Sequence, residues 1–116
     1  MLGPGHPATL TIRANIARWT GEAGDPGGAR DQFTGMLPII ERLLGPGHPQ
    51  ILRTRASLAR WTGEAGDPGG ARDQFTALLP VYERVLGPWH PETVTTVGYH
   101  SYWTGEADSG TGLGME

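Results

Sequence analysis

The chain has no cysteine and no lysine among its 116 residues. Without cysteine, the protein can form neither disulfides nor thiolate metal sites. Its 9 basic residues are all arginine, a usage typical of GC-rich bacterial genomes, so a bacterial origin is expected. No apolar run approaches the roughly 18 residues that a membrane-spanning helix needs, and the first residues have neither the basic nor the apolar region of a signal peptide. These absences predict a soluble, cytoplasmic protein without a membrane partner.

An excess of positive charge is also missing. The 9 basic and 12 acidic residues are mixed along the chain and give a net charge of −3. Binding to nucleic acid needs a basic stripe that neutralises successive phosphates, so we expect no nucleic-acid partner. Glycine, in contrast, is abundant at 19 residues. Because each glycine within a helix costs about 0.5–1 kcal/mol relative to alanine, we expect low stability.

A repeat of 42 residues organises the sequence. Residues 2–43 recur as residues 44–85 with 31 of 42 positions identical, and a partial third copy covers residues 86–106. Repetition at this period is typical of stacked units that bury their apolar faces on one another. It predicts one domain over residues 1–106, followed by a disordered tail over residues 107–116. A stacked array presents surface rather than a single catalytic pocket, so the chain is not expected to be an enzyme.

Each complete copy predicts two antiparallel helices. Clusters of Gly, Pro and His at residues 3–7, 45–49 and 87–91 end in a proline, which suits the first turn of a helix. Gly24, Asp25 and Pro26 then predict the end of one helix, the cap of the next and its first turn. Pro38 lies inside this second helix and predicts a kink or a short break. Two hairpins and one further helix make an all-α fold, an α-solenoid of antiparallel helix pairs with about two and a half repeats and five helices.

Apolar residues at helical spacing predict the core. In the first helix, Ile12, Ile16 and Trp19 recur on one face, and Trp61 and Trp103 follow Trp19 at the repeat period. These tryptophans are therefore expected to be buried. In the second helix of each unit, the equivalent aromatic residues Phe33 and Phe75 are expected to fill the core between helices.

The repeated polar residues favour structural roles over chemistry. His6, His48 and His90 are 42 residues apart, and a stack separates them by roughly 10 Å or more, too far to share a zinc ion, so we expect them to cap structure. The segment 24–28 is not expected to bind phosphate, because Asp25 places a negative charge where an anion would lie. We expect no catalytic residue, no cofactor and no metal.

The repeat resembles a tetratricopeptide repeat of the kinesin-light-chain-like type, whose units are about 42 residues long. The matching residues are a large–small pair, a turn glycine, and a small and an aromatic residue of the second helix: Ile16, Ala17, Gly24, Ala29 and Phe33, repeated as Leu58, Ala59, Gly66, Ala71 and Phe75. One departure is threonine at positions 20, 62 and 104, where the family often has tyrosine. The resemblance implies a protein-interaction module or scaffold, as a fragment of a larger signalling or regulatory protein.

In proteins of that family the first helices of the units line a concave groove. Carried over to this chain, the resemblance implies a peptide-binding groove lined by Asn15, Arg18, Arg53, Ser57, Arg60, Tyr99 and Tyr102. Arginine in such a groove can bind a carboxylate with two parallel hydrogen bonds. Two alternatives stay open: a solvated helix face without a ligand, and a self-associating piece that forms a homo-oligomer through exposed end helices.

Overall fold

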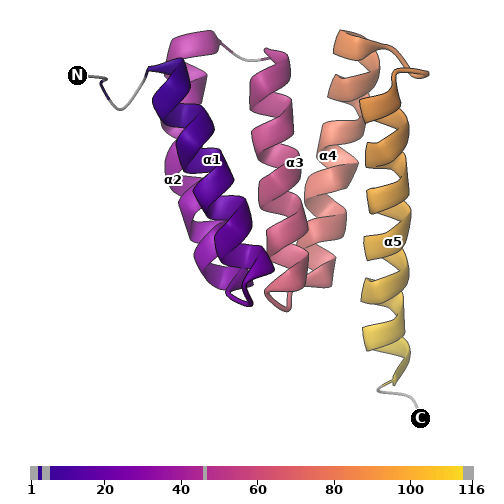
Figure 1. The fold of residues 1–116 in the computed structure, drawn as a ribbon. Coiled ribbons are helices and arrows are strands. Elements are labelled where there is room, and N and C mark those ends of the chain that lie inside the picture. The colour runs from indigo at the N-terminus through magenta and orange to yellow at the C-terminus, as the bar shows by residue number, and fades with distance from the viewer. Residues whose placement is uncertain (1–2, 4–5, 46, 114–116) are drawn as a thin grey trace.

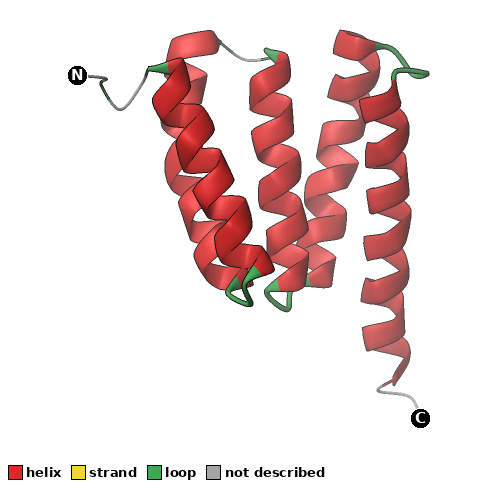
Figure 2. Cartoon of the chain, viewed as in Figure 1, coloured by secondary structure: helices red, strands yellow, loops and turns green. Residues whose placement is uncertain are grey.

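The computed structural model describes residues 3, 6–45 and 47–113, and these residues fold into five α-helices and no strand. The helices are α1 (Pro7–Glu22), α2 (Pro26–Leu44), α3 (Pro49–Glu64), α4 (Pro68–Leu86) and α5 (Pro91–Leu113). Each helix packs against the next in the chain, and together they form an elongated row of 57 × 33 × 20 Å (Figure 1). Short loops join them (Figure 2). The predicted all-α solenoid of antiparallel helix pairs is confirmed.

Side chains cap the helix starts, as the sequence predicts. Before α1, α3 and α5, the Nδ1 atom of His6, His48 or His90 accepts a hydrogen bond from the backbone N–H two residues later, at 3.1, 3.0 and 3.1 Å. Before α2 and α4, the carboxylates of Asp25 and Asp67 accept from backbone N–H groups at 2.9 Å. These bonds satisfy donors that have no partner within a helix.

The turn within each hairpin depends on glycine. Gly24 and Gly66 follow the ends of α1 and α3 with φ angles of 108° and 107°. Side chains with a Cβ atom rarely adopt such angles. The chain therefore reverses direction within three residues, and the second helix of each pair begins directly after them.

Pro38 and Pro80 do not interrupt their helices. α2 and α4 continue through these residues to Leu44 and Leu86, so the predicted short break does not occur. In Figure 1 the last turns of α2 lie at an angle to the rest of that helix, as expected where proline removes one backbone hydrogen bond. Met36 and Ile40, on either side of Pro38, are fully buried, and their packing keeps the segment helical.

The core consists of two clusters, each closed by the helix that follows a hairpin. The first cluster contains buried side chains of α1 and α2 together with Ile51 and Trp61 of α3. The second contains side chains of α3 and α4 together with Trp103 of α5. Phe33 and Phe75 are buried in the first and second cluster respectively, as predicted. Each unit therefore depends on its successor to complete its core.

The prediction of a buried face is wrong for α1. Ile12, Ile16 and Trp19 are exposed at 55%, 50% and 61%, whereas Trp61 and Trp103 are exposed at only 3% and 5%. In α3 and α5 this face packs on the preceding hairpin, but no described helix precedes α1. α1 instead buries Leu10 and Ala17 against α2.

α5 is longer than the sequence predicts. It continues to Leu113, whereas a disordered tail was expected from residue 107; residues 114–116 of that tail lie outside the described residues. Helix propagation adds one hydrogen bond per residue once the helix has been nucleated, and the buried Ala107 prolongs the packed part of α5 beyond Trp103.

No described helix covers α5 as α2 covers α1 and α4 covers α3. In the two complete hairpins, the hydroxyl oxygens of Thr20 and Thr62 accept hydrogen bonds from the amide groups of Gln32 and Gln74, at 3.1 and 3.2 Å. The equivalent hydroxyl group of Thr104 is buried and has no hydrogen-bond partner among the described residues. Among the described residues, α5 therefore lacks the second helix whose glutamine binds the equivalent hydroxyl group in the other two units.

Candidate functional site

A cleft lies between α3 and α5, the first helices of successive units. It encloses about 450 Å³ and is lined by Arg60, Glu64, Thr95, Gly98, Tyr99, Tyr102 and Trp103. The α3 side contributes a pair of opposite charges one helical turn apart, and the α5 side contributes aromatic rings. The cleft therefore offers both charged and apolar contacts to a ligand.

Arg60 is held at the edge of this cleft by an aromatic ring. Its guanidinium carbon lies 4.3 Å from the centre of the Trp61 ring, at the distance of a cation–π contact. Since Trp61 is buried between α1 and α3, the ring is a fixed support. Guanidinium N–H groups can bind a carboxylate with two parallel hydrogen bonds.

Two tyrosines form the opposite wall. The ring of Tyr99 stacks on buried Phe75 with a centroid distance of 5.7 Å and an interplanar angle of 22°. The ring of Tyr102 meets Trp103 edge to face, at 4.7 Å and 82°. Tyr102 is 55% exposed, so a large part of its ring is open to a partner. Because both rings rest on buried aromatics, the wall is ordered before any ligand binds.

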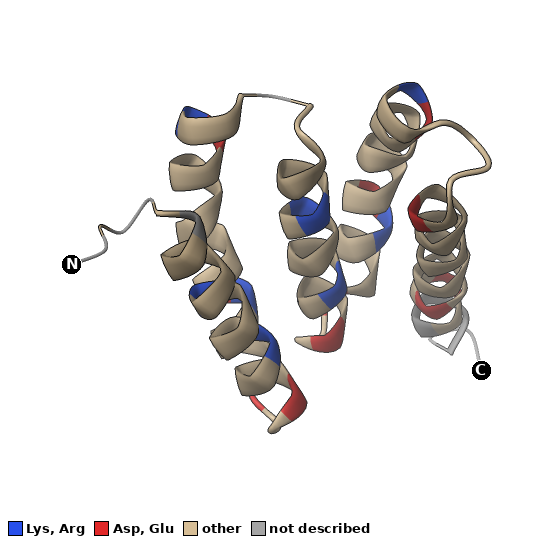
Figure 3. Ribbon diagram, turned by 45° about the horizontal axis from the view of Figure 1, so that its top comes forward, with Lys and Arg blue, Asp and Glu red and all other residues tan. Residues whose placement is uncertain are grey.

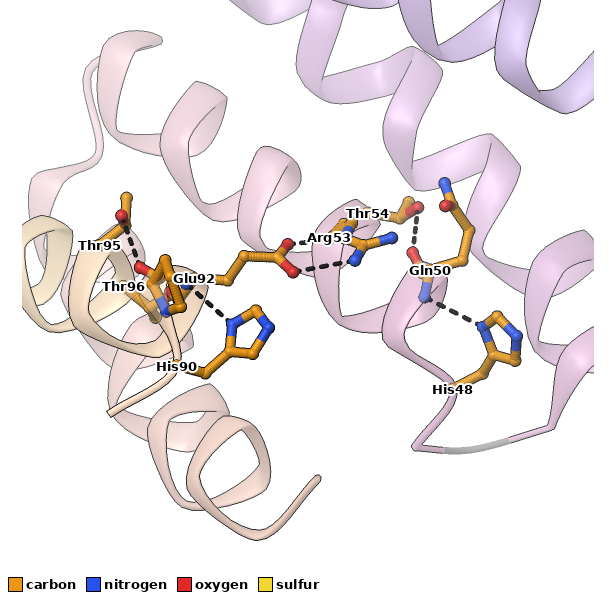
Figure 4. A network of polar contacts seen from close by, with 9 residues as sticks. His48, Gln50, Arg53, Thr54, His90, Glu92, Thr95 and Thr96 are labelled. Atoms are coloured by element: carbon orange, nitrogen blue, oxygen red, sulfur yellow. Dashed lines mark hydrogen bonds and ion pairs between the residues drawn. The ribbon is translucent and has the colours of Figure 1, made fainter. Parts of the chain in front are cut away.

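A second cleft adjoins the first and shares Thr95 and Tyr99 with it. Here Arg53 of α3 binds Glu92 of α5 through two hydrogen bonds, Nε to Oε1 at 2.6 Å and Nη2 to Oε2 at 2.9 Å (Figure 4). The hydrogen bond from Arg53 lowers the pKa of the Glu92 carboxyl group, and the same bond raises the pKa of Arg53. The pair joins the two helices at this end of the groove.

Tyr82 lies at the base of the second cleft and is buried. This burial raises the pKa of its hydroxyl group. The clefts together form one groove, which runs between α3 and α5 from the Arg53–Glu92 pair to Arg60 and Tyr102.

Comparison with known proteins identifies the family of the chain. The tetratricopeptide repeat family matches the chain over residues 9–50 and again over residues 51–92. The chain belongs to the tetratricopeptide repeat family. Repeats of this family generally mediate protein–protein interaction and are generally not enzymes.

A solved structure shows the same fold. The crystal structure of a putative kinesin light chain with nearly identical TPR-like repeats, from Podosopora anserina, superposes with a TM-score of 0.74 at 20% sequence identity. The match covers 97% of this chain and 54% of that one, so this tetratricopeptide array spans about half the length of the solved chain. A search of curated proteins found no match.

The groove brings together some of the residues that the sequence nominated. Arg60, Tyr99 and Tyr102 line the first cleft, and Arg53 and Tyr99 line the second. Ser57 lies on α3 and lines neither cleft, and the same holds for Asn15 and Arg18 on α1. The Arg18 guanidinium lies 3.7 Å from the carboxylate of Glu22 on its own helix.

Glu92 is one of the groove residues that sequence reasoning missed. Its position holds alanine in the first copy and glutamine in the second, and the position of Arg53 holds threonine in the other two copies. Two variable positions that face each other across neighbouring units therefore carry opposite charges. This variation between copies could have indicated that residues 53 and 92 interact. Only the register between α3 and α5 shows that the two residues lie opposite each other.

The described part of the chain has neither the side-chain cluster of a metal site nor a membrane-spanning helix. No group of three or more His, Asp or Glu side chains there has the arrangement of a metal site. None of its helices is both long and apolar enough to cross a membrane.

Proposed function

We propose that this tetratricopeptide array binds an extended segment of a partner protein along the groove between α3 and α5. The observation that carries the proposal is the pair of adjoining clefts, which share Thr95 and Tyr99 and so offer a continuous path. An extended segment places side chains alternately on its two sides, and it can therefore meet the arginine side and the tyrosine wall at once.

Arg60 and Tyr102 have distinct roles in this proposal. Arg60 binds a carboxylate of the segment, either an acidic side chain or a chain terminus, because guanidinium matches the geometry of carboxylate oxygens. The exposed ring of Tyr102 contacts an apolar side chain of the segment, as tyrosine often does at protein interfaces. Arg53 is already bound to Glu92, so it shapes the groove rather than binding the ligand directly.

The proposal is tested with peptides selected against the wild-type protein from a library of short random sequences. Affinities of the selected peptides are then measured by calorimetry for Arg60→Ala and Tyr102→Ala. Each substitution is expected to weaken binding by about tenfold or more, which corresponds to at least about 1.4 kcal/mol at a contact that dominates binding. Thermal melts of both variants establish that the fold is retained.

Arg42→Ala is the matched control, because Arg42 is an exposed arginine on α2, away from both clefts. It is expected to leave peptide affinity unchanged. The peptide affinity of Arg18→Ala tests whether the binding surface extends over α1, as the family resemblance implies. If selected peptides bind Arg60→Ala and Tyr102→Ala as tightly as wild type, the groove between α3 and α5 is not the binding surface.

A further inference from the structure

Tryptophan of one unit packs on glycine of the preceding unit at both internal junctions. A Cβ atom placed on Gly21 of α1 would lie 2.6 Å from the ring of Trp61, and one placed on Gly63 of α3 would lie 2.7 Å from the ring of Trp103. Only glycine leaves room for the ring at these two positions. At each junction between units, a tryptophan ring therefore occupies the space that the neighbouring helix leaves free because it has glycine there.

At the two ends of the row, the equivalent tryptophan and the equivalent glycine do not make this contact within the described chain. Trp19 is equivalent to Trp61 and Trp103 by the 42-residue period, yet it is 61% exposed on α1. Gly105 is equivalent to Gly21 and Gly63, and a Cβ atom placed on it would meet no described atom within 4 Å. α1 and α5 lie at opposite ends of the solenoid (Figure 1), so one end carries the ring and the other carries the glycine over which the equivalent rings lie at the internal junctions.

The faces around these residues are also exposed and partly apolar. On α1, Ile12 and Ile16 extend the exposed apolar stripe of Trp19 along the helix. On α5, Val94 and Ser101 are exposed on the same side as Gly105, whereas their equivalents Leu10 and Ala17 of α1 are buried beneath α2. The exposed face of α1 thus carries larger side chains than the exposed face of α5. In the other units, a neighbouring helix covers the face equivalent to each of these.

The two end helices differ in charge. α1 carries two arginines and one glutamate, a net charge of +1. α5 carries two glutamates, one aspartate and no arginine, and because Glu92 is paired with Arg53 of α3, Glu106 and Asp108 leave α5 a charge of −2. Figure 3 shows this contrast, with basic residues on α1 and only acidic ones on α5. Opposite charges on the two ends favour the approach of α1 to α5 over that of two like ends.

We propose that α1 of one copy of this chain packs on the uncovered face of α5 of a second copy, with Trp19 seated over Gly105. The contact joins two different surfaces, so every added copy still presents a free α1 at one end and a free α5 at the other. Such a head-to-tail contact extends into open chains unless the rotation between copies closes a ring. The proposed peptide groove lies elsewhere, between α3 and α5 of a single copy.

Sedimentation velocity of the full chain tests this proposal, with protein from about 10 μM to about 1 mM, a range that detects weak association. The average mass of the wild-type protein is expected to rise above the monomer mass of 12.4 kDa as concentration increases. Trp19→Arg blocks the α1 end and Gly105→Arg blocks the α5 end, so each variant alone is expected to remain monomeric. Their equimolar mixture is expected to form a dimer and nothing larger, because one intact α1 and one intact α5 remain.

Both substitutions are at open positions, and replacing glycine with arginine within a helix favours the helix, so circular dichroism is expected to show retained folding. Ile16→Arg and Ser101→Arg serve as a second pair if either variant unfolds. Trp89→Arg, in the loop before α5 where Trp89 is 87% exposed, is the control and is expected to associate as wild type does. The proposal is overturned by a monomeric wild type at all concentrations, by association of either blocked variant alone, by a monomeric mixture, or by loss of association in the control.

Discussion

Replacing Gly63 with alanine is expected to destabilise this protein, although the same change stabilises most helices. The added Cβ atom would lie 2.7 Å from three atoms of the Trp103 ring, well inside normal van der Waals separation. Trp103 is buried among side chains of α3 and α4, so the ring cannot withdraw without disturbing the second core cluster. The gain in helix propensity is about 0.5–1 kcal/mol and the cost of overpacking is about 1–3 kcal/mol. The net loss is therefore about 1 kcal/mol at the middle of these ranges and at most about 2.5 kcal/mol.

Gly105→Ala is the matched control at the equivalent position of the third unit. No described atom lies within 4 Å of the added Cβ atom there, so only the propensity gain of about 0.5–1 kcal/mol remains. Gly21→Ala should behave like Gly63→Ala, because its Cβ atom would lie 2.6 Å from the Trp61 ring. The effect of the same substitution on the free energy of unfolding is thus expected to differ in sign among three equivalent positions. The sign depends on whether a tryptophan ring lies against the substituted residue.

Urea unfolding followed by far-UV circular dichroism measures these differences. Protein concentrations near 10 μM, at the low end of the range used to measure association, keep weak contacts between copies sparse and so separate stability from association. The midpoint is expected to fall for Gly63→Ala and Gly21→Ala and to rise for Gly105→Ala. If Gly63→Ala raises the midpoint as much as Gly105→Ala does, Trp103 is not seated on α3 and the stacking of units described above is refuted.

Three further predictions concern the core, a cap and an ion pair. Phe75→Ala should lower the free energy of unfolding by about 3–5 kcal/mol because the ring is fully buried; an unchanged thermal melt would contradict this. His48→Ala should cost about 0.5–2 kcal/mol through loss of its cap, whereas His48→Asn should restore most of it; equal melts for both variants would rule out the capping role. The pKa of Glu92 is lowered in the folded protein by Arg53. The stabilisation by this ion pair is therefore fully present above the ordinary glutamate pKa of about 4.3. It is lost as the pH falls through the lowered pKa of Glu92 in the folded protein. Because the pair is partly exposed, Glu92→Gln should cost at most about 1 kcal/mol at neutral pH, and a difference from wild type that persisted in strong acid would show that the ion pair is not its cause.

Local chemistry made most of the helical framework predictable. A Gly-Pro-x-His-Pro segment fixes a helix start through proline geometry and a histidine cap, and both depend on residues within a few positions of each other. The Gly24-Asp25-Pro26 turn is equally local. The 42-residue period then made stacked hairpins the expected arrangement, because repeated apolar faces bury one another. The family resemblance led to the same fold.

The environment of equivalent residues was less predictable. Trp19 and Trp61 have nearly identical neighbours in the sequence, yet one is exposed and the other buried, because burial depends on whether a preceding hairpin is present. The groove shows the same limitation. Arg18 and Arg60 are equivalent in sequence, but only Arg60 has a described aromatic wall from the next unit opposite it.

The sequence by itself determined where each helix begins, which residues cap it, and that near-identical units follow one another, because these properties depend on backbone geometry and short-range hydrogen bonds. Only the tertiary structure decided which copies of a repeated side chain are buried, that Arg53 pairs with Glu92, and that Gly105 lies open at one end while Trp19 lies open at the other. Those outcomes depend on contacts between units, and a residue's own sequence neighbourhood does not contain them.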